Sequence, residues 1–252
     1  MGRLLVSEIV WTEVKKNLNN IKLAIVPAGS CEQHGPNTTF TTDTDRANEF
    51  CKLLGERIKE KALIFPPITY GVSYHHMGFP GTVTLDVKTM IDVFVDIGVS
   101  IGKHGINKIL FVNGHGGNRV ALDAAIQILK NKHGIDAYWS GMGTNIARKT
   151  LEEKYGIPKI IGHAWEVETS QCMYLAPWDV SDNLQAGILH EQSAYFKKTF
   201  VDGNAAWDWK NDVSENGALG DATQSSYEMG KLMTDIALDY FEKVIDEIIL
   251  RN

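Results

Sequence analysis

The chain has 252 residues, of which 44% are hydrophobic and 22% are charged, and it carries a formal net charge of −6. These fractions are close to those of folded globular proteins and argue against wholesale disorder. The negative charge disfavours binding to nucleic acid or to an anionic membrane, and no apolar run is long enough to cross a bilayer.

The cysteines and the N-terminal residues favour a cytoplasmic location. Cys31, Cys51 and Cys172 are odd in number and show no C-x-x-C spacing, so we expect reduced thiols. The first residues lack the basic start, the long apolar stretch and the cleavage site of a signal peptide.

Short β-branched runs alternate along the chain with amphipathic helical stretches. In chain order the pattern predicts a strand over 21–29, a helix over 45–61, a strand over 62–71, a helix over 85–105, a strand over 107–112, a helix over 119–134, a strand over 135–141 and a C-terminal helix over 227–250. Alternation at this spacing implies right-handed βαβ units around a parallel sheet that is covered on both faces. We therefore expect an α/β fold in one domain, residues 1–252.

Capping residues mark several predicted helix ends. Asp86 is the expected N-cap of the helix over 85–105, and Gly105 closes it. Asp45 can cap the helix over 45–61. The segment 177–220 has little periodicity, so we expect loops that wrap the domain or build a subunit contact. Its tryptophans can line a pocket or such a contact: Trp178, Trp207 and Trp209.

Histidine and carboxylate residues follow the predicted strands. The stretch "GSCEQHGPNTTFTTDTD" places Glu32, His34 and Asp43 after the first strand, and "NGHGGN" places His115 after the strand over 107–112. In an open parallel sheet, ligands bind at the carboxyl ends of the strands. A third cluster, "GHAWEVETS", offers His163, Glu166 and Glu168. Imidazole and carboxylate without thiolates favour Zn, Mn or Fe(II).

The spacing is compatible with two metal ions. An aspartate between two ions can bridge them, and ions roughly 3.5–4 Å apart can hold a shared hydroxide and polarise a carbonyl together. Two other interpretations stay open. "NGHGGN" between a strand and a helix can cradle a phosphate at the helix N-terminus, and a single-metal site can use Glu168 as a general base.

Four blocks of the sequence resemble the signature blocks of the creatininase (creatinine amidohydrolase) family. They are "PAGSCEQHGPNTTFTTDTD", "HHMGFPGTVTL", "NGHGGN" and "HAWEVETS", and they lie between residues 27 and 170. The resemblance implies a three-layer α/β/α sandwich with a mainly parallel central sheet. It also implies a site with two divalent ions that hydrolyses a C–N bond, often in a cyclic amide, and a homo-oligomer, commonly a hexamer.

The resemblance also implies roles for individual residues. Glu32, Asp43 and His115 match the ligands of one metal, and His34 matches a ligand of the second, with Asp43 bridging. His163 matches a histidine expected to act in proton transfer. Glu168 matches an acidic active-site position, and Trp139 matches a tryptophan that closes over the substrate. Apart from the resemblance, the place of Tyr74, His75 and His76 just before "GFPGT" makes them candidates for substrate contacts, and an ordinary polar loop is the other interpretation.

One departure from the family pattern affects the second metal. Creatininases proper have an aromatic residue and then a metal-binding glutamate where this chain has Gly116 and Gly117. Glu168 is then the first candidate for the missing carboxylate, and Glu166 the second. The loss of the aromatic residue also removes part of a creatinine pocket.

We therefore expect a metal-dependent amidohydrolase that cleaves a C–N bond of a small-molecule amide through a metal-bridged hydroxide. The expected substrate is creatinine, or the substrate of another enzyme closely related to creatinine amidohydrolase. Formamide deformylation, cyclic keto-inositol hydrolysis and the peptidase chemistry of peptide-cofactor maturation are alternatives on the same site. A non-catalytic module that binds a phosphorylated ligand is the alternative from a different class.

Overall fold

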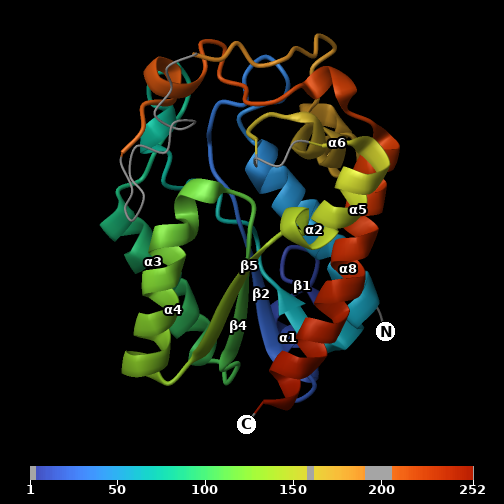
Figure 1. Ribbon diagram of the computed structural model, residues 1–252. Coiled ribbons are helices and arrows are strands. Elements are labelled where there is room, and N and C mark those ends of the chain that lie inside the picture. The colour runs from blue at the N-terminus through green and yellow to red at the C-terminus, as the bar shows by residue number, and fades with distance from the viewer. Residues whose placement is uncertain (1–3, 158–161, 191–205, 252) are drawn as a thin grey trace.

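A sheet of five parallel strands runs through the centre of the computed structural model, which describes residues 4–157, 162–190 and 206–251 (Figure 1). The order of the strands across the sheet is β1-β3-β2-β4-β5. Their bounds are Leu4–Leu5 for β1, Leu23–Ala28 for β2, Ala62–Ile64 for β3, Lys108–Asn113 for β4 and Asp136–Gly141 for β5. All four pairings between neighbouring strands are parallel, as the alternating pattern predicts.

Helices cover both faces of this sheet. In Figure 1, α3 and α4 lie on one side of the strands, and α2, α5, α6 and α8 lie on the other. The helix bounds are Trp11–Asn17 for α1, Thr42–Ile58 for α2, Val87–Gly102 for α3, Arg119–His133 for α4, Thr144–Tyr155 for α5, Glu166–Leu175 for α6 and Tyr227–Leu250 for α8. The expected three-layer α/β/α sandwich is confirmed.

Strand β2 shows why the sheet needs two helical layers. Leu23 and Ile25 pack with residues of α2 and α8, whereas Ala24 and Val26 pack on the opposite face with residues of α3 and α4. Each of these four side chains is at most 1% exposed. A strand that is apolar on both faces is stable only when both faces are covered.

Several predicted element ends are confirmed and others are wrong. Asp86 caps α3 by accepting a hydrogen bond from the Lys88 amide at 2.8 Å. The strand predicted over 62–71 ends at Ile64, because the prolines that follow cannot donate to a ladder. Asp45 does not cap α2, since this helix begins at Thr42 and Asp45 lies within its first turn. α3 ends at Gly102, three residues before Gly105.

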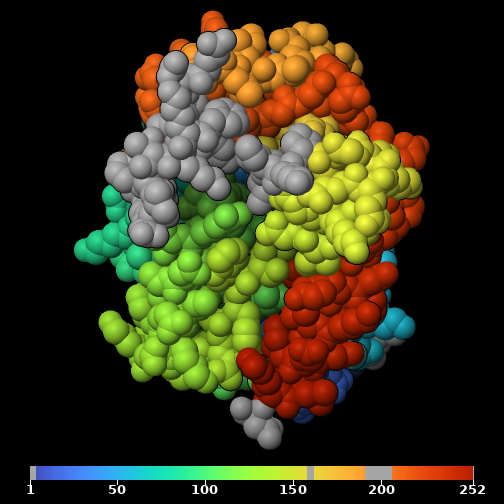
Figure 2. Space-filling model, in the orientation of Figure 1, coloured from blue at the N-terminus to red at the C-terminus, as the bar shows by residue number. Residues whose placement is uncertain are grey.

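The described parts of the irregular segment predicted over 177–220 lie across the carboxyl ends of the strands. Figure 2 shows them in orange at that end of the molecule. They contain short helical turns at Pro177–Asp179 and Trp209–Val213, and residues 191–205 lie outside the described residues. Among the helices that the structure describes, none is long and apolar enough to cross a membrane.

Candidate metal centre

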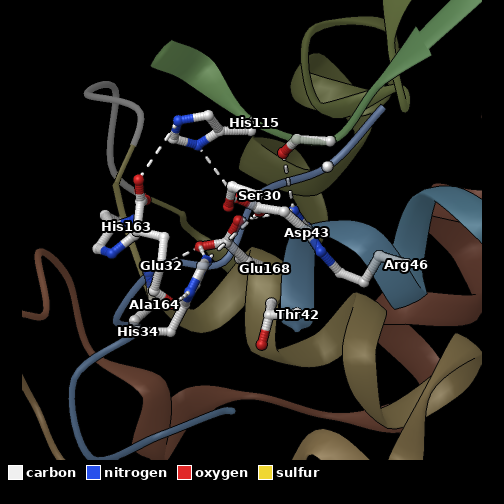
Figure 3. A network of polar contacts seen from close by, with 12 residues as sticks. Ser30, Glu32, His34, Thr42, Asp43, Arg46, His115, His163, Ala164 and Glu168 are labelled. Carbon is white, nitrogen blue, oxygen red and sulfur yellow. Dashed lines mark hydrogen bonds and ion pairs between the residues drawn. The ribbon is translucent and has the colours of Figure 1, made fainter. Parts of the chain in front are cut away.

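Four of the predicted ligands meet where β2 and β4 end. Strands β2 and β4 are neighbours in the sheet, so the loops that follow them converge. Glu32 and His34 come from the loop after β2, Asp43 from the first turn of α2, and His115 from the loop after β4 (Figure 3). Each of these side chains is at most 2% exposed.

Asp43 lies between the two histidines. Its Oδ1 is 3.4 Å from Nε2 of His34, and its Oδ2 is 3.1 Å from Nδ1 of His115. Ser30 Oγ also donates a hydrogen bond to Oδ2, at 2.7 Å. The two oxygens of one carboxylate therefore face two different imidazoles, which is the arrangement that a bridging ligand requires.

Backbone carbonyls determine which ring nitrogen of each histidine carries a proton. Nδ1 of His34 is 3.0 Å from the Glu32 carbonyl, and Nε2 of His115 is 2.8 Å from the Val72 carbonyl. A carbonyl can only accept, so these two nitrogens are the donors. In the neutral rings, the lone pairs then point from His34 Nε2 and His115 Nδ1 toward Asp43. Metal-binding histidines characteristically donate their second nitrogen in this way.

Two buried polar atoms of the centre lack a hydrogen-bond partner. Glu32 Oε2 and His34 Nε2 are buried and have no hydrogen-bond partner among the described residues, although buried polar atoms are normally paired. Atoms of Glu32, His34 and Asp43 lie close enough together to hold one ion, and so do atoms of His34, His163 and Glu168. The donors are imidazoles and carboxylates, so the site fits divalent Zn, Mn or Fe.

Glu168, and not Glu166, reaches this centre. Glu168 lies in the first turn of α6, and its Oε2 is 3.8 Å from Nε2 of His34. Glu166 turns away and accepts a hydrogen bond from the Asp221 amide at 2.8 Å. Glu168 is thus the carboxylate that stands beside His34.

The turn before α6 holds both His163 and Glu168 in place. Ala164 has a positive φ of 50°, which costs an L-residue roughly 1–3 kcal/mol. Its amide donates to Glu168 Oε2 at 2.7 Å, and its carbonyl accepts from Asn37 at 2.8 Å. His163 is fixed further by paired backbone hydrogen bonds with Leu219. The strained turn therefore aims two site residues at the same centre.

Gly117 explains why the "NGHGGN" block supplies no carboxylate. A Cβ at this position would lie 1.9 Å from the Val72 carbonyl oxygen and 2.5 Å from Nε2 of His115. Backbone fills this space, so a glutamate is excluded here unless the loop through Val72 moves. This packing alone explains why position 117 is a glycine, and phosphate binding is not needed to explain it.

Arg46 is a site residue that the sequence analysis missed. It is 4% exposed, and its Nη2 lies 2.7 Å from Glu168 Oε1 and 3.2 Å from Asp43 Oδ1. Its Nη1 donates to Gln171 at 3.3 Å. Its position in the sequence could have identified it, because Arg46 lies one helical turn after Asp43 on the same face of α2. Its charge partly offsets those of the neighbouring carboxylates.

Burial and mutual charge shift the pKa values of the ligands. Burial raises the pKa of Glu32 to about 7. Burial disfavours the charged imidazolium of His34, but Asp43 outweighs it and raises the pKa of His34 to about 9. Burial is likewise outweighed at His115, where Glu32 and Asp43 raise the pKa to about 9. Protons therefore occupy the two histidines of the metal-free protein at neutral pH.

These protons should be released when metal binds. Because His34 and His115 must be deprotonated to act as ligands, metal affinity should rise with pH up to about 9 and level off above it. At pH 7 we expect release of about two protons per chain from the histidines and a fraction of a third from Glu32. Titration calorimetry in buffers of different ionisation enthalpy measures this number. Binding without proton release would contradict the assignment of both histidines.

A cavity of about 450 Å³ opens over the centre. Among the predicted substrate and proton-transfer residues, four line it: His75, His76, Trp139 and His163. The Trp139 indole N–H donates to Asp123 at 2.8 Å. Tyr74 is 52% exposed and its hydroxyl donates to Asp86 at 2.7 Å, outside the lining of this cavity.

Trp209 supplies an aromatic wall that the sequence did not place. Its ring centroid lies 4.7 Å from that of His76 and 5.2 Å from that of His163. It is 7% exposed, and its indole N–H donates to the Gly217 carbonyl at 2.9 Å. Trp178, from the same irregular segment, is instead 61% exposed.

Comparison with known proteins gives a consistent picture. A family model described as creatinine amidohydrolase (creatininase) matches residues 7–245. The chain is 33% identical to the mycofactocin precursor peptide peptidase of Mycolicibacterium smegmatis over 226 residues, which covers 87% of this chain and 83% of that protein. It is 30% identical to the 3-dehydro-scyllo-inosose hydrolase of Thermotoga maritima over 259 residues, which covers 95% of this chain and 81% of that protein.

More distant relatives share the fold. The creatinine amidohydrolase of Pseudomonas putida is 25% identical, with 96% of each chain covered. A crystal structure of creatininase superposes with a TM-score of 0.85 at 22% identity, and the match covers 99% of each chain. Given the family match over nearly the whole chain, this protein belongs to the creatininase family of amidohydrolases.

Proposed function

We propose that this protein hydrolyses an amide C–N bond with the help of two divalent cations. Glu32, Asp43 and His115 would hold one ion, and His34, Asp43 and Glu168 the other. The observation that carries the proposal is that each oxygen of Asp43 faces one nitrogen of a different imidazole, and that the other nitrogen of each ring donates to a backbone carbonyl. Such ions lower the pKa of bound water and polarise a carbonyl.

His163 is the proposed proton carrier. Its Nε2 is 2.7 Å from the Gln33 carbonyl and so donates, which leaves Nδ1 as an acceptor. Nδ1 lies 3.8 Å from Glu32 Oε1, and the residue lines the cavity. His163 can therefore take a proton from the attacking water and return it to the leaving nitrogen.

The substrate proposed is a small-molecule amide, either cyclic or part of a short peptide. The cavity volume is within the range of roughly 300–1,000 Å³ that small-molecule sites have. A peptide amide is the second candidate for a specific reason: Gly116 is exposed, and a Cβ added to it would meet nothing within 4 Å. The rim beside His115 is therefore open to a substrate longer than one ring, and one relative is named as a peptidase.

Metal content is the first test of this function. Protein purified without added metal should contain about two Zn, Mn or Fe ions per chain, and a chelator should abolish hydrolysis. Creatinine, other cyclic amides, formamides and short peptides should be assayed on the same sample. A protein that stays inactive after each metal is added back, or whose activity survives complete metal removal, would contradict the proposal.

We also propose a cytoplasmic homo-oligomer, a hexamer by family resemblance, that binds neither nucleic acid nor membrane. Exposed apolar side chains support a subunit contact. They include Trp178 at 61%, Tyr74 at 52% and Met77 at 50% exposed. Light scattering of the purified protein measures the number of subunits.

A further inference from the structure

The side-chain amide of Gln33 has an orientation that its neighbours determine. Gln33 stands between Glu32 and His34 and is 5% exposed. Its Oε1 accepts a hydrogen bond from the Gly35 amide at 2.7 Å. Its Nε2 is consequently the donor end, and it lies 2.7 Å from Nδ1 of His76 and 3.2 Å from the Gly217 carbonyl. Both N–H bonds of the amide therefore have acceptors.

This orientation assigns the proton of His76. Because Nδ1 of His76 accepts from Gln33, the ring carries its proton on Nε2. Nε2 lies 3.2 Å from Oε1 of Glu32, so His76 donates to that carboxylate. Glu32 then has one oxygen occupied by His76. Its second oxygen, Oε2, lies 3.3 Å from Nε2 of His115 and has no hydrogen-bond partner among the described residues.

We propose that Gln33 is a positioning residue that acts through His76 to aim Glu32 at the metal centre. The chain of hydrogen bonds runs from the Gly217 carbonyl through Gln33 and His76 to Glu32 Oε1. It leaves Oε2, which has no hydrogen-bond partner among the described residues, as the oxygen that would bind the metal. This inference rests on the proposed metal centre, and it adds an outer partner to one ligand. Outer hydrogen bonds of this kind hold a ligand in its binding orientation.

Gly217 leaves free the space that the side chain of Gln33 occupies. A Cβ on Gly217 would lie 2.0 Å from Oε1 of Gln33, and its φ of +88° is one that glycine adopts without strain. The same carbonyl accepts from the Trp209 indole. The segment after residue 206 therefore touches the metal centre through Gln33, although it supplies none of the proposed ligands.

His163 offers a comparison within the same molecule. Its Nε2 donates to the backbone carbonyl of Gln33 at 2.7 Å. The side-chain nitrogen of Gln33 also lies 3.2 Å from this Nε2, but it is itself a donor and cannot accept the proton. A substitution at position 33 changes the side-chain bond to His76 and leaves the backbone bond to His163 in place. The two histidines should therefore respond differently to the same mutation.

Gln33→Glu is the informative variant because it keeps the shape and reverses the polarity of the bond. A carboxylate oxygen would face Nδ1 of His76, so this ring would have to carry a proton on Nδ1. ¹⁵N NMR of histidine-labelled, metal-free protein distinguishes the two ring nitrogens. We expect wild-type His76 to show Nε2–H, the variant to show Nδ1–H, and His163 to be the same in both. His76→Asn and His163→Asn identify the signals.

Metal affinity is the second measurement. Gln33→Met removes the bond without adding charge, and zinc affinity measured by chelator competition should fall by about 10- to 100-fold. Gln127→Met is the matched control, since Gln127 is exposed on α4 and its side chain bonds only Asn131 in the described structure. Zinc binding to this control should equal that of the wild type.

The outcomes separate this inference from the proposed function. A wild-type protein that binds no zinc would overturn the metal centre, while the NMR signals would still report the Gln33–His76 bond. Wild-type His76 protonated on Nδ1, or zinc affinity unchanged in Gln33→Met, would overturn the role of Gln33. A folded Gln33→Met variant keeps the test decisive if Gln33→Glu fails to fold.

Discussion

Replacement of Asp43 by asparagine should cost on the order of a thousand-fold in hydrolysis and leave the protein unable to retain either metal ion. Asparagine keeps one acceptor oxygen and turns the other into an N–H donor. That donor would face the lone pair of His34 or of His115 and satisfy it in place of a cation. A thousand-fold loss corresponds to about 4 kcal/mol of transition-state stabilisation. Bound metal ions typically contribute several kcal/mol of this kind.

Asp45→Asn is the matched control for this variant. Asp45 lies two residues further along α2, and the one contact of its side chain in the described structure is with the Trp178 indole, at 3.3 Å. Its replacement should leave metal content and activity unchanged. Both variants should be compared by metal analysis, initial rates and thermal unfolding. Full metal content in folded Asp43→Asn protein would rule out a bridging role for this residue.

His34→Ala should remove one metal position and leave the other. His34 provides the only imidazole nitrogen that faces Oδ1 of Asp43 among the described residues, whereas Glu32, Asp43 and His115 remain in place. We expect the metal content to fall from about two ions to about one per chain. Hydrolysis should fall at least roughly a hundred-fold, because the two ions are proposed to act together.

His133→Ala serves as the comparison for this second variant. His133 is the exposed last residue of α4, at the opposite end of this helix from the loop that carries His115. The His133→Ala variant should bind metal and hydrolyse the substrate like the wild type. If His34→Ala retained near-normal activity and an unchanged metal content, the assignment of two metal positions would fail.

The positions of Glu32 and His115 were predictable because they follow from sheet topology. Their strands are apolar runs that end in glycine-containing turns, and parallel neighbours present their carboxyl ends at one edge. The strands β2 and β4 are indeed paired, with Ala28 opposite Asn113. The sequence therefore predicted correctly that Glu32 and His115 lie close together, without information on any side-chain contact.

The helix that carries Glu168 was not predictable by the same reasoning. α6 buries most of its residues, and these include Thr169, Ser170 and Gln171 as well as the apolar ones. A helix that is buried almost all round, with polar residues inside, has no amphipathic stripe to detect. The assignment of Glu168 came from the family resemblance, and only the structure shows why Glu166 points elsewhere.

Arg46 and Gln33 were missed for a related reason. In the sequence each has only a local setting, since Arg46 lies within the predicted helix over 45–61 and Gln33 is the middle residue of "EQH". Their roles depend on partners more than 40 residues away, Glu168 in one case and His76 in the other. Single-sequence patterns report local periodicity, so such long-range polar contacts leave no trace in them.

The wide separation of the proposed ligands along the chain has a consequence for the way the protein matures. Glu32, His34 and Asp43 are neighbours in sequence, but His115 joins them only after β4 has paired with β2, and Glu168 only after α6 has docked. Such non-local pairings form late in folding because long loops must close first. The complete site therefore does not exist in a partly folded chain. Metal is expected to load onto a finished fold, unlike the zinc of small domains that fold around their ion, and it then stabilises that fold by mass action.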